Sequence, residues 1–481
     1  MKILFTHSYF LHFDDKQLKT CSPFPPLATL YAAAVLRENN YDVRLADLQF
    51  SASPDDIKQH LEQFKPDAFV IYDDSFNYLN KMCLTNMRAA AFRMQQIAKE
   101  YGIPVIISSS DATDHLENYF AHGADYVIIG EAEQTLLELV NTLKNNKKNI
   151  SLINGLAYAV DNSIVKTTPR SVLKELDQLP LPAWDLIEIA PYKKMWLAKH
   201  GYFYINFVTT RGCPYKCNWC AKPVYGNRYN SHSAKKSAQQ IKDLQLKFGF
   251  THVWFADDIF GLKPNWLKEF NEAVKDLDLK INYKIQSRAD LLLENENINY
   301  LALSGCTEVW IGAESGSQKI LDAMDKGTSI NQIKDATQLL KKHNIKPCFF
   351  LQFGYIGELI DDIKKTIALV DNLKPYDIGI SVSYPLPGTK FYEKVKQDLV
   401  LKQNWKDSDD LHILFKSTYK PEFYRYLQRF VHYKFRYAQA LELIKKGKLN
   451  KRTILGSYYY FKQFSLRKKL QKIETDAVSL F

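Results

Sequence analysis

The sequence lacks any apolar run long enough to cross a membrane, and it has few cysteines for its length. No stretch approaches the roughly 18 apolar residues that a membrane span needs, and the opening Met1–Phe5 is too short for the core of a signal peptide. Seven cysteines in 481 residues are too few for a disulfide scaffold. These absences argue against a membrane-spanning or disulfide-stapled protein and predict a cytoplasmic one.

The composition is that of an ordinary globular protein, with 46% hydrophobic and 24% charged residues. A chain of 481 residues exceeds what one hydrophobic core usually holds, so we expect two or three domains. The net charge of +11 is unevenly placed: residues 401–481 contain 18 Lys plus Arg against 7 Asp plus Glu, whereas the first 400 residues contain 46 of each. The whole excess therefore lies in the C-terminal tail.

Residues 1–150 alternate short apolar runs with segments of helical periodicity. Because the runs are apolar at consecutive positions, they suit a parallel sheet that is covered on both faces. Intervening segments such as Leu27–Arg37 and Met87–Glu100 are long enough for crossover helices. The fold class predicted here is α/β, beginning with an open, doubly wound, flavodoxin-like sheet. Its expected strands are Ile3–Thr6, Val43–Leu45, Ala68–Ile71, Val105–Ile107 and Tyr126–Ile129.

Sheets of this kind bind ligands beyond the carboxyl ends of their strands. Thr6–Phe10, Asp73–Asn77 and Ser108–Thr113 would therefore line a pocket. No Gly-x-Gly-x-x-Gly fingerprint follows the first strand, which argues against a dinucleotide. A planar or bulky ligand resting on the sheet edge is the better prediction.

Three further regions follow the first sheet. Residues 151–200 are interpreted as a linker that packs through Trp184 and Trp196. Residues 201–390 resume the strand–helix alternation and predict a partial six-unit (β/α) barrel, whose chemistry would lie on the loops after the strands. Residues 391–481 predict a basic helical extension. The expected barrel strands are Tyr204–Thr209, His252–Phe255, Ile281–Ile285, Glu308–Gly312, Cys348–Phe353 and Ile378–Ser383.

Three cysteines, Cys213, Cys217 and Cys220, lie within eight residues, directly after the first predicted barrel strand. Their spacing lets all three thiols reach one inorganic centre. Structural zinc would need a fourth ligand, and no second Cys-x-x-Cys or His pair is present. A four-iron cluster held by three thiolates instead leaves one iron open for a substrate or cofactor. The other cysteines, which are scattered singly and interpreted as small buried hydrophobes, are Cys21, Cys83, Cys306 and Cys348.

The Cys-x-x-x-Cys-x-x-Cys motif after the first strand of a six-unit barrel resembles the radical S-adenosylmethionine (radical SAM) superfamily. The resemblance implies that Cys213, Cys217 and Cys220 ligate a catalytic [4Fe–4S] cluster whose open iron is chelated by S-adenosylmethionine. The reduced cluster would donate one electron and yield methionine plus a 5′-deoxyadenosyl radical. Trp219, the aromatic residue before the last cysteine, would stand beside the adenine.

Other strand ends match that family. Phe255–Phe260, Gln286–Asp290 and Gly312–Ser315 follow the second, third and fourth barrel strands. In relatives these ends meet the methionine and ribose parts of the cofactor, so the resemblance implies cofactor-binding roles for three polar residues. These are Asp257, Arg288 and Glu314. The alternative for each is a loop cap or a surface ion pair.

A doubly wound sheet before such a barrel is similar to the cobalamin-binding radical SAM enzymes, over about residues 1–390. Pro25–Ala28, Asp125–Glu133 and Leu176–Pro182 match that family in order along the chain. The resemblance implies cobalamin bound above the first sheet, with Ser108, Ser109 and Ser110 among its contacts. Relatives carry a Gly-Gly-Pro run at these serines, and the Asp-x-His-x-x-Gly signature of other cobalamin proteins is absent here.

The resemblance implies cobalamin-dependent methylation of an unactivated carbon or phosphorus centre in a small-molecule substrate. An electron donor such as flavodoxin or ferredoxin would be a partner. Some members of the family rearrange, cyclise or oxidise their substrates instead, and this alternative stays open.

An alternative from another class is a nucleic-acid-binding or membrane-surface protein that acts through the basic, aromatic tail. Tyr458–Phe461 and Arg467–Lys469 would stack on bases and meet phosphates, or lie on an anionic membrane. We favour a third interpretation of the tail, in which a basic surface covers the barrel mouth and the aromatic residues are buried beneath it.

Overall fold

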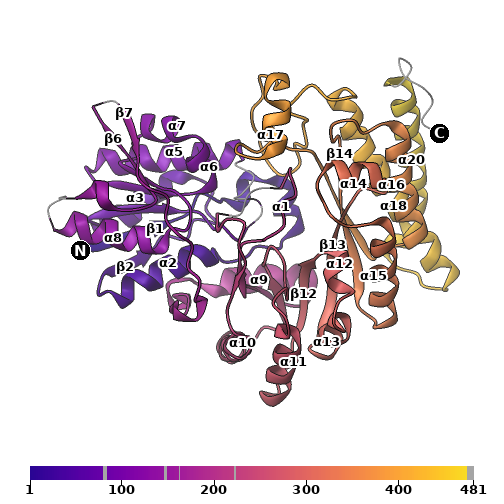
Figure 1. The fold of residues 1–481 in the computed structure, drawn as a ribbon, viewed down its shortest axis with the longest axis horizontal. Coiled ribbons are helices and arrows are strands. Elements are labelled where there is room, and N and C mark those ends of the chain that lie inside the picture. Colours follow the sequence, from indigo (N-terminus) through magenta and orange to yellow (C-terminus); the bar gives the residue numbers. More distant parts are fainter. Residues whose placement is uncertain (78, 80–83, 146–148, 162, 221–223, 474–481) are drawn as a thin grey trace.

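The computed structural model describes all residues except 78, 80–83, 146–148, 162, 221–223 and 474–481. Within the described residues, no helix is both long and apolar enough to span a bilayer. Figure 1 shows two α/β bodies side by side, with a pair of long helices at the end farthest from the N-terminus.

The first body is the predicted doubly wound sheet. Its described strands have the order β2-β1-β3-β4-β5-β6-β7, and β1 to β5 are parallel. The parallel strands are almost wholly apolar because helices cover both faces: α2 and α8 pack on one, α3 and α5 on the other. The bounds are β1 (Lys2–Thr6), β2 (Asp42–Leu45), β3 (Ala68–Tyr72), β4 (Val105–Ser108), β5 (Tyr126–Ile128), α2 (Leu27–Glu38), α3 (Ile57–Phe64), α5 (Thr85–Glu100) and α8 (Glu133–Lys144).

Two further strands come from the segment that we interpreted as a linker. β6 (Leu156–Val160) pairs antiparallel with β5, and β7 (Ser163–Lys166) pairs antiparallel with β6. A signal that the sequence analysis did not use is the run Leu156–Val160, which is apolar throughout and is followed by Asp161, a residue type that is rare in strands. Helix α9 (Ile189–His200) then leads to the second body.

The second body is an open, all-parallel sheet with the strand order β15-β14-β13-β12-β11-β8. The predicted partial barrel is confirmed. The strand bounds are β8 (Tyr204–Phe207), β11 (His252–Phe255), β12 (Asn282–Ser287), β13 (Cys306–Glu314), β14 (Lys346–Phe353) and β15 (Asp377–Val382). The helices that alternate with them include α10 (Ala234–Phe248), α11 (Trp266–Asp276), α13 (Asn297–Leu303), α15 (Ile330–Lys342) and α16 (Ile360–Leu373).

Three consecutive residues of the first body, Pro23–Pro25, contact α9 and the barrel strands. The Trp196 indole donates a hydrogen bond to the Pro23 carbonyl at 2.8 Å, and the Asn206 amide donates to the Pro25 carbonyl at 2.9 Å. Between them the Phe24 ring lies 4.6 Å from that of Trp254, measured between ring centres. Side chains of both sheets consequently share one continuous apolar core.

The C-terminal region is helical, as predicted, with α17 (Lys390–Val395), α18 (Pro421–Lys445), α19 (Lys451–Ile454) and α20 (Gly456–Ile473). α18 packs against β15 and α16, and α20 packs along α18 (Figure 1). Our favoured interpretation of the tail was wrong about its aromatic residues: Tyr458, Tyr460, Phe461 and Phe464 are exposed. Within the described residues α20 packs mainly on α18, with a smaller contact to α19, and these four side chains remain exposed.

Candidate functional site

The cysteine loop begins where β8 ends, at the carboxyl edge of the barrel sheet, and Asp257 fixes its first turn. This carboxylate is 1% exposed and accepts hydrogen bonds from the Thr209 and Thr210 backbone N–H groups and the Thr209 hydroxyl, at 2.7–2.8 Å. Burial raises the pKa of Asp257 to about 7, although the hydrogen bonds favour its charged form. The predicted cofactor residue thus holds the strand end that leads to the cysteines.

None of the three cysteines forms a disulfide bond. Burial, the nearby Asp258 and the other two thiols all raise the pKa of Cys220, to about 12. Within the described residues, no three His, Cys, Asp or Glu side chains stand in an array that could hold a metal ion. The donor set fits an iron–sulfur cluster, but the loop that carries Cys213, Cys217 and Cys220 has to draw the sulfurs together to bind it.

Asn218, inside the cysteine loop, anchors it to the barrel. Its side-chain amide donates to the Ala323 carbonyl at 2.8 Å and its side-chain oxygen accepts from the Tyr355 hydroxyl at 2.7 Å. Its backbone N–H donates to the Met324 carbonyl at 3.0 Å. The sequence analysis missed this residue, because a lone Asn between two cysteines gives no signal of such distant partners.

Arg288 reaches the cysteine loop from the end of β12. Its guanidinium pairs with Asp290 at 2.8 Å, donates to the Lys326 carbonyl at 2.7 Å and stacks 3.7 Å from the ring centre of Tyr215. One guanidinium nitrogen also lies 3.9 Å from the Cys217 sulfur. The structure therefore places the positive charge of Arg288 beside the cysteine loop.

Glu314 ends β13 in the left-handed backbone region, at φ 54°, and pairs with Lys326 at 2.8 Å. Both side chains are less than one-tenth exposed, and the ammonium lies 6.0 Å from a ring centre of Trp219. The Trp219 indole N–H is buried without an acceptor among the described residues. An unpartnered donor of this kind fits a ligand such as adenine, which carries acceptor nitrogens.

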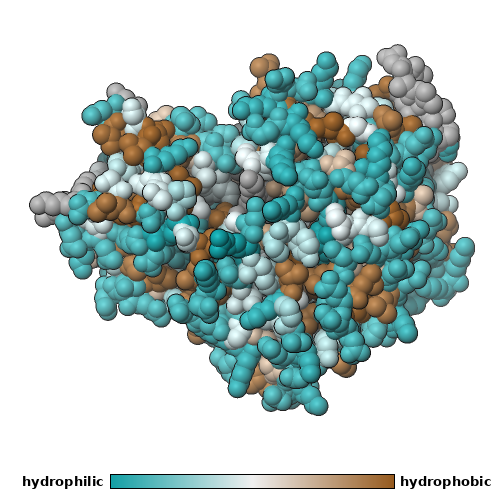
Figure 2. Space-filling model, viewed as in Figure 1, coloured by the Kyte–Doolittle hydropathy of each residue, from teal (hydrophilic) through white to brown (hydrophobic). Residues whose placement is uncertain are grey.

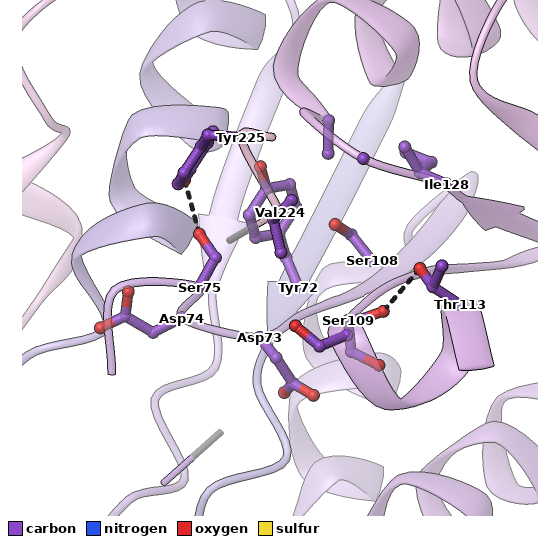
Figure 3. A pocket seen from close by; sticks show the side chains of 13 residues that line it. Tyr72, Asp73, Asp74, Ser75, Ser108, Ser109, Thr113, Ile128, Val224 and Tyr225 are labelled. Carbon is purple, nitrogen blue, oxygen red and sulfur yellow. Dashed lines mark hydrogen bonds between the residues drawn. The ribbon is translucent and has the colours of Figure 1, made fainter. Parts of the chain in front are cut away.

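The serines lie at the edge of the first sheet, where a small cavity opens (Figure 3). Ser109 caps α6 (Ser110–Asp114) by accepting a hydrogen bond from the Ala112 N–H at 2.9 Å. The cavity has a volume of about 20 Å³, enough for about one water molecule. Its lining is Tyr72, Asp73, Asp74, Ser75, Ser108, Ser109, Ser110, Thr113, Ile128, Gly130, Ala132, Val224 and Tyr225.

The polar side chains of this lining fit a polar ligand at a sheet edge, but the cavity is too small to admit a corrin. Val224 and Tyr225, which close the cavity from the segment after the cysteines, would have to move. The Tyr225 hydroxyl is held by Ser75, with 2.6 Å between their oxygens. The expectation that Asp73–Asn77 and Ser108–Thr113 border a common pocket agrees with this lining in part.

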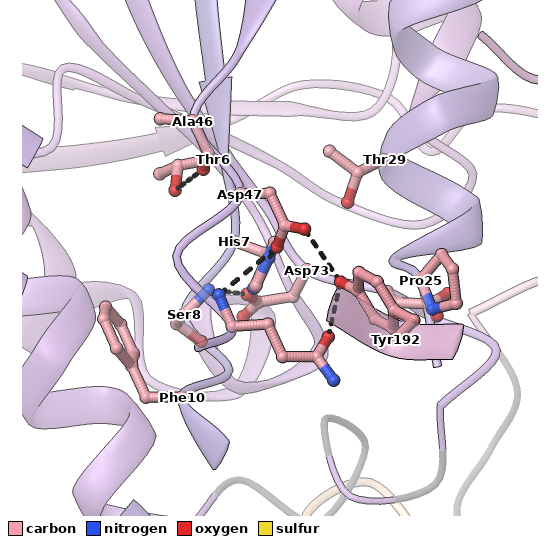
Figure 4. A network of polar contacts seen from close by, with 12 residues as sticks. Thr6, His7, Ser8, Phe10, Pro25, Thr29, Ala46, Asp47, Asp73 and Tyr192 are labelled. Atoms are coloured by element: carbon pink, nitrogen blue, oxygen red, sulfur yellow. Dashed lines mark hydrogen bonds and ion pairs between the residues drawn. The ribbon is translucent and has the colours of Figure 1, made fainter. Parts of the chain in front are cut away.

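The first predicted pocket segment, Thr6–Phe10, is instead largely engaged in a buried polar network (Figure 4). His7 contacts Asp47 at 2.9 Å, and the Ser8 N–H donates to Asp73 at 2.7 Å. The Tyr192 hydroxyl, from α9, donates to Asp47 at 2.8 Å. This network fastens the ends of β1 and β3 to the helix that leads into the barrel.

Arg211 bridges the two sheets. It stands two residues before Cys213 and is 3% exposed, and its guanidinium forms ion pairs with Glu131 and Glu133, at 2.5 and 2.7 Å, just after β5. The same guanidinium lies 4.9 Å from the ring centre of Tyr225. The sequence analysis missed this link, although an Arg beside a cysteine motif and two acids beyond a strand end were visible.

Two family models match the chain. The radical SAM superfamily model matches residues 207–370, and the B12 binding domain model matches residues 19–140. The first match contains the cysteine loop together with Asp257, Arg288 and Glu314, and the second contains Ser108–Ser110.

The relatives of this chain have different named activities. An uncharacterized methyltransferase of Pyrococcus horikoshii is 27% identical over 390 residues, which are 79% of this chain and 81% of the relative. The anaerobic magnesium-protoporphyrin IX monomethyl ester cyclase of Rubrivivax gelatinosus is 25% identical over 82% of this chain and 70% of its own length. The bacteriochlorophyllide d C-8(2)-methyltransferase of Chlorobaculum tepidum is 23% identical over 74% and 78%.

Solved structures share the fold. OxsB, a cobalamin-dependent S-adenosylmethionine radical enzyme solved with aqua-cobalamin and S-adenosylmethionine, matches with a TM-score of 0.75 and 17% identity over 97% of this chain and 72% of its own. TsrM of Kitasatospora setae, a radical S-adenosylmethionine methyltransferase solved with cobalamin and a [4Fe-4S] cluster, matches with a TM-score of 0.68 and 16% identity over 82% and 74%. The chain therefore carries a domain that matches the B12 binding domain model ahead of one that matches the radical SAM superfamily model, and it shares its fold with cobalamin-dependent radical SAM enzymes.

Proposed function

We propose that this enzyme methylates an unactivated carbon or phosphorus centre of a small-molecule substrate. The observation that carries the proposal is the shared wall between the two sheet edges. Tyr225 closes the cavity at Ser108 and also packs on Arg211, two residues before Cys213. Group transfer between two cofactors requires neighbouring sites, and a proposed cobalamin site that shares Tyr225 with the start of the cysteine loop would meet this requirement.

The cofactors are a [4Fe–4S] cluster, S-adenosylmethionine and cobalamin. When bound, they supply reductive cleavage of S-adenosylmethionine to a 5′-deoxyadenosyl radical and, through cobalamin, a route for methyl transfer.

The residues of the chain divide into holding and orienting groups. Cys213, Cys217 and Cys220 are proposed to hold the cluster. Arg288, with its guanidinium beside Cys217, would help to orient the adenosyl cofactor. The serines Ser108–Ser110 are proposed to form the floor of the cobalamin site.

Three further residues are proposed to position the adenosyl cofactor. Glu314 presents a carboxylate that Lys326 holds in place. Trp219 offers a buried indole N–H that has no other acceptor in the described part of the chain. Asp257, whose oxygens accept from Thr209 and Thr210, would act through the strand end rather than by direct contact.

The reaction needs an electron from outside the chain, so we propose a flavodoxin or ferredoxin as a partner. A cytoplasmic setting would suit it, because a reducing compartment keeps cysteine ligands available.

Rearrangement, cyclisation or oxidation is the second candidate, favoured by relatives with other chemistry. Besides the cyclase of Rubrivivax gelatinosus, a 4'-phospho-dehydrooxetanocin synthase of Priestia megaterium is 25% identical over 56% of this chain and 38% of its own length.

A labelling experiment separates the two candidates. The anaerobically reconstituted enzyme is incubated with a reductant, S-adenosylmethionine labelled in its methyl group, and a small-molecule extract. Methyl transfer predicts S-adenosylhomocysteine and a product that gains one labelled methyl group. Formation of 5′-deoxyadenosine with no label in any product would reject the methylation proposal and favour the second candidate.

A cysteine variant tests the cluster assignment separately. Replacing Cys213, Cys217 and Cys220 together with alanine should remove iron, sulfide and S-adenosylmethionine cleavage while the fold survives. Cys21→Ala, outside the loop, is the matched control. If the triple variant still cleaved S-adenosylmethionine, the cluster would have other ligands.

A further inference from the structure

The helical hairpin of α18, α19 and α20 carries a concentration of exposed apolar side chains. Leu441, Ile444, Tyr460 and Phe461 line one groove between the helices, with a volume of about 420 Å³. Leu449 and Ile454, at the tip of the hairpin, are 87% and 76% exposed. We define the apolar ridge as Leu441, Ile444, Leu449, Ile454, Tyr460, Phe461 and Phe464.

The α20 part of the ridge lies on the exposed side of that helix. Leu466 and Leu470 are buried against α18, while Phe461 and Phe464, separated from them by about half a turn, are 68% and 47% exposed. Exposed apolar residues are ordinary when they are scattered among hydrophilic ones, as on the face in Figure 2. A group of aromatic and aliphatic side chains, such as the four that line the groove, marks an interaction site.

Cations surround the ridge. From Leu441 to Ile473 the chain has ten Lys or Arg residues and one acid, Glu442, a net charge of +9. Lys445, Lys446 and Lys448 are exposed directly before Leu449. Further along α20, Lys468 lies 4.7 Å from the ring centre of Phe464.

We propose that the hairpin docks on an anionic lipid bilayer, with the apolar ridge in the interface and the lysines over the headgroups. A helical hairpin that exposes aromatic and aliphatic side chains with lysines beside them is suited to that interface, because the rings enter the headgroup region and the ammonium groups meet the anionic lipids. The enzyme lies on the membrane and does not span it, since no helix of the described residues qualifies as a span.

Charge and side-chain type select this occupant over the others. Two copies of the chain would bring two faces of charge +9 together, which repels them. Nucleic acid would match the lysines and the rings, but Leu449 and Ile454 gain nothing from bases or phosphates. A bilayer satisfies the aliphatic side chains and the charge together.

The test is co-sedimentation of the full-length holoenzyme with vesicles of phosphatidylcholine alone and with vesicles that also contain phosphatidylglycerol. We expect binding to the anionic vesicles only. Replacing Phe461 and Phe464 with serine should weaken the binding by about tenfold or more for each ring that is buried. Lys445→Glu with Lys448→Glu should weaken it comparably.

Matched controls come from the barrel helices. Leu246 on α10 and Leu303 on α13 are 75% and 64% exposed, and their serine variants should bind as the wild type does. Because all of these side chains are exposed, the variants should fold. As a second readout, a Phe464→Trp variant should show a blue-shifted emission on anionic vesicles and quenching by brominated lipid.

Several outcomes would overturn the proposal. Equal binding by the Phe461/Phe464 and Leu246/Leu303 variants would indicate adsorption of a polycation. Tighter binding to single-stranded RNA than to vesicles would assign the surface to nucleic acid. Concentration-dependent dimers that disappear in the Phe461/Phe464 variant would assign it to a second copy.

Discussion

Arg211 and Glu133 form a buried ion pair that joins the barrel to the first sheet, with 2.7 Å between the guanidinium nitrogen and the carboxylate oxygen. Replacing Arg211 with glutamine would leave Glu131 and Glu133 buried without their cation. We expect the free energy of unfolding to fall by about 3–5 kcal/mol. Urea unfolding of the full chain measures the loss.

The exposed pair Arg37–Asp185, at 2.6 Å, is the control for that measurement. Its side chains are 41% and 54% exposed, so water already screens the charges. Arg37→Gln should cost less than about 1 kcal/mol. Equal losses in the two variants would mean that burial does not set the strength of the Arg211 pair.

Gly212, between Arg211 and Cys213, permits a close backbone approach. Its φ is +82°, and a Cβ atom there would lie 2.2 Å from the Arg228 carbonyl oxygen. Gly447 has a similar φ of +69° with open space around it. We expect Gly447→Ala to cost about 1–2 kcal/mol for the backbone strain alone, and Gly212→Ala to cost clearly more. The two unfolding free energies test this, and equal values would remove the steric argument.

Variants of Ser110 and Ser109 separate two effects, the loss of space in the proposed cobalamin site and the loss of the helix cap of α6. Ser110→Leu fills the cavity without touching the cap, and we expect it to abolish corrinoid uptake. Ser109→Ala removes the cap, costs about 1 kcal/mol of stability and leaves the cavity open. Corrin absorption after anaerobic titration is the readout. Normal uptake by Ser110→Leu would place the corrin elsewhere.

Replacing Arg288 or Glu314 with alanine is expected to weaken the binding of S-adenosylmethionine. A charge-assisted hydrogen bond contributes roughly 1.5–3 kcal/mol, so the loss should be about tenfold or more. Equilibrium binding and the rate of 5′-deoxyadenosine formation give the effect, and iron content is the control because it should not change. If both variants keep wild-type affinity and rate, the two side chains only stabilise their loops.

Glu358 gives a pH-dependent prediction. Burial raises the pKa of this carboxyl to about 8, and one oxygen has no partner among the described residues. Because the folded pKa lies above the unfolded one, the stability contributed by the protonated form is complete below pH 4.5 and is lost as the pH rises to about 8. Glu358→Gln should therefore stabilise the protein at pH 8.5 relative to pH 5.5, by roughly 3–5 kcal/mol at most.

The measurement for Glu358 is the difference in unfolding free energy between variant and wild type at the two pH values. The exposed Glu272→Gln is the matched control. A difference that did not change with pH would show that Glu358 is ionised in the folded protein throughout this range.

The strands and the cysteine loop were predictable because their signals are local. Runs such as Val105–Ile107 are apolar at every position, and β4 spans Val105–Ser108. The strand-end location of Arg288 and Glu314 came from the resemblance to a family, and the structure adds their partners. Their roles toward the adenosyl cofactor stay predictions.

The contacts that assemble the site could not be predicted, because their partners are far apart in sequence. Arg211 and Glu133 are 78 positions apart, and Asn218 meets Tyr355 across 137. The exposure of Phe461 could not be predicted from the sequence either, because it depends on which side of α20 packs on α18.

The contacts of Pro23, Phe24 and Pro25 with α9 and the barrel affect how chimaeras of this protein can be designed. A chimaera cut between the two bodies would keep the Trp196 and Asn206 donors while exchanging the backbone carbonyls that accept from them, and would set a foreign side chain against Trp254. A domain boundary drawn between the two bodies in sequence therefore does not mark a unit that can be exchanged by itself. An exchange of the barrel should also include residues 23–25, so that their carbonyl groups and the Phe24 ring keep the same partners.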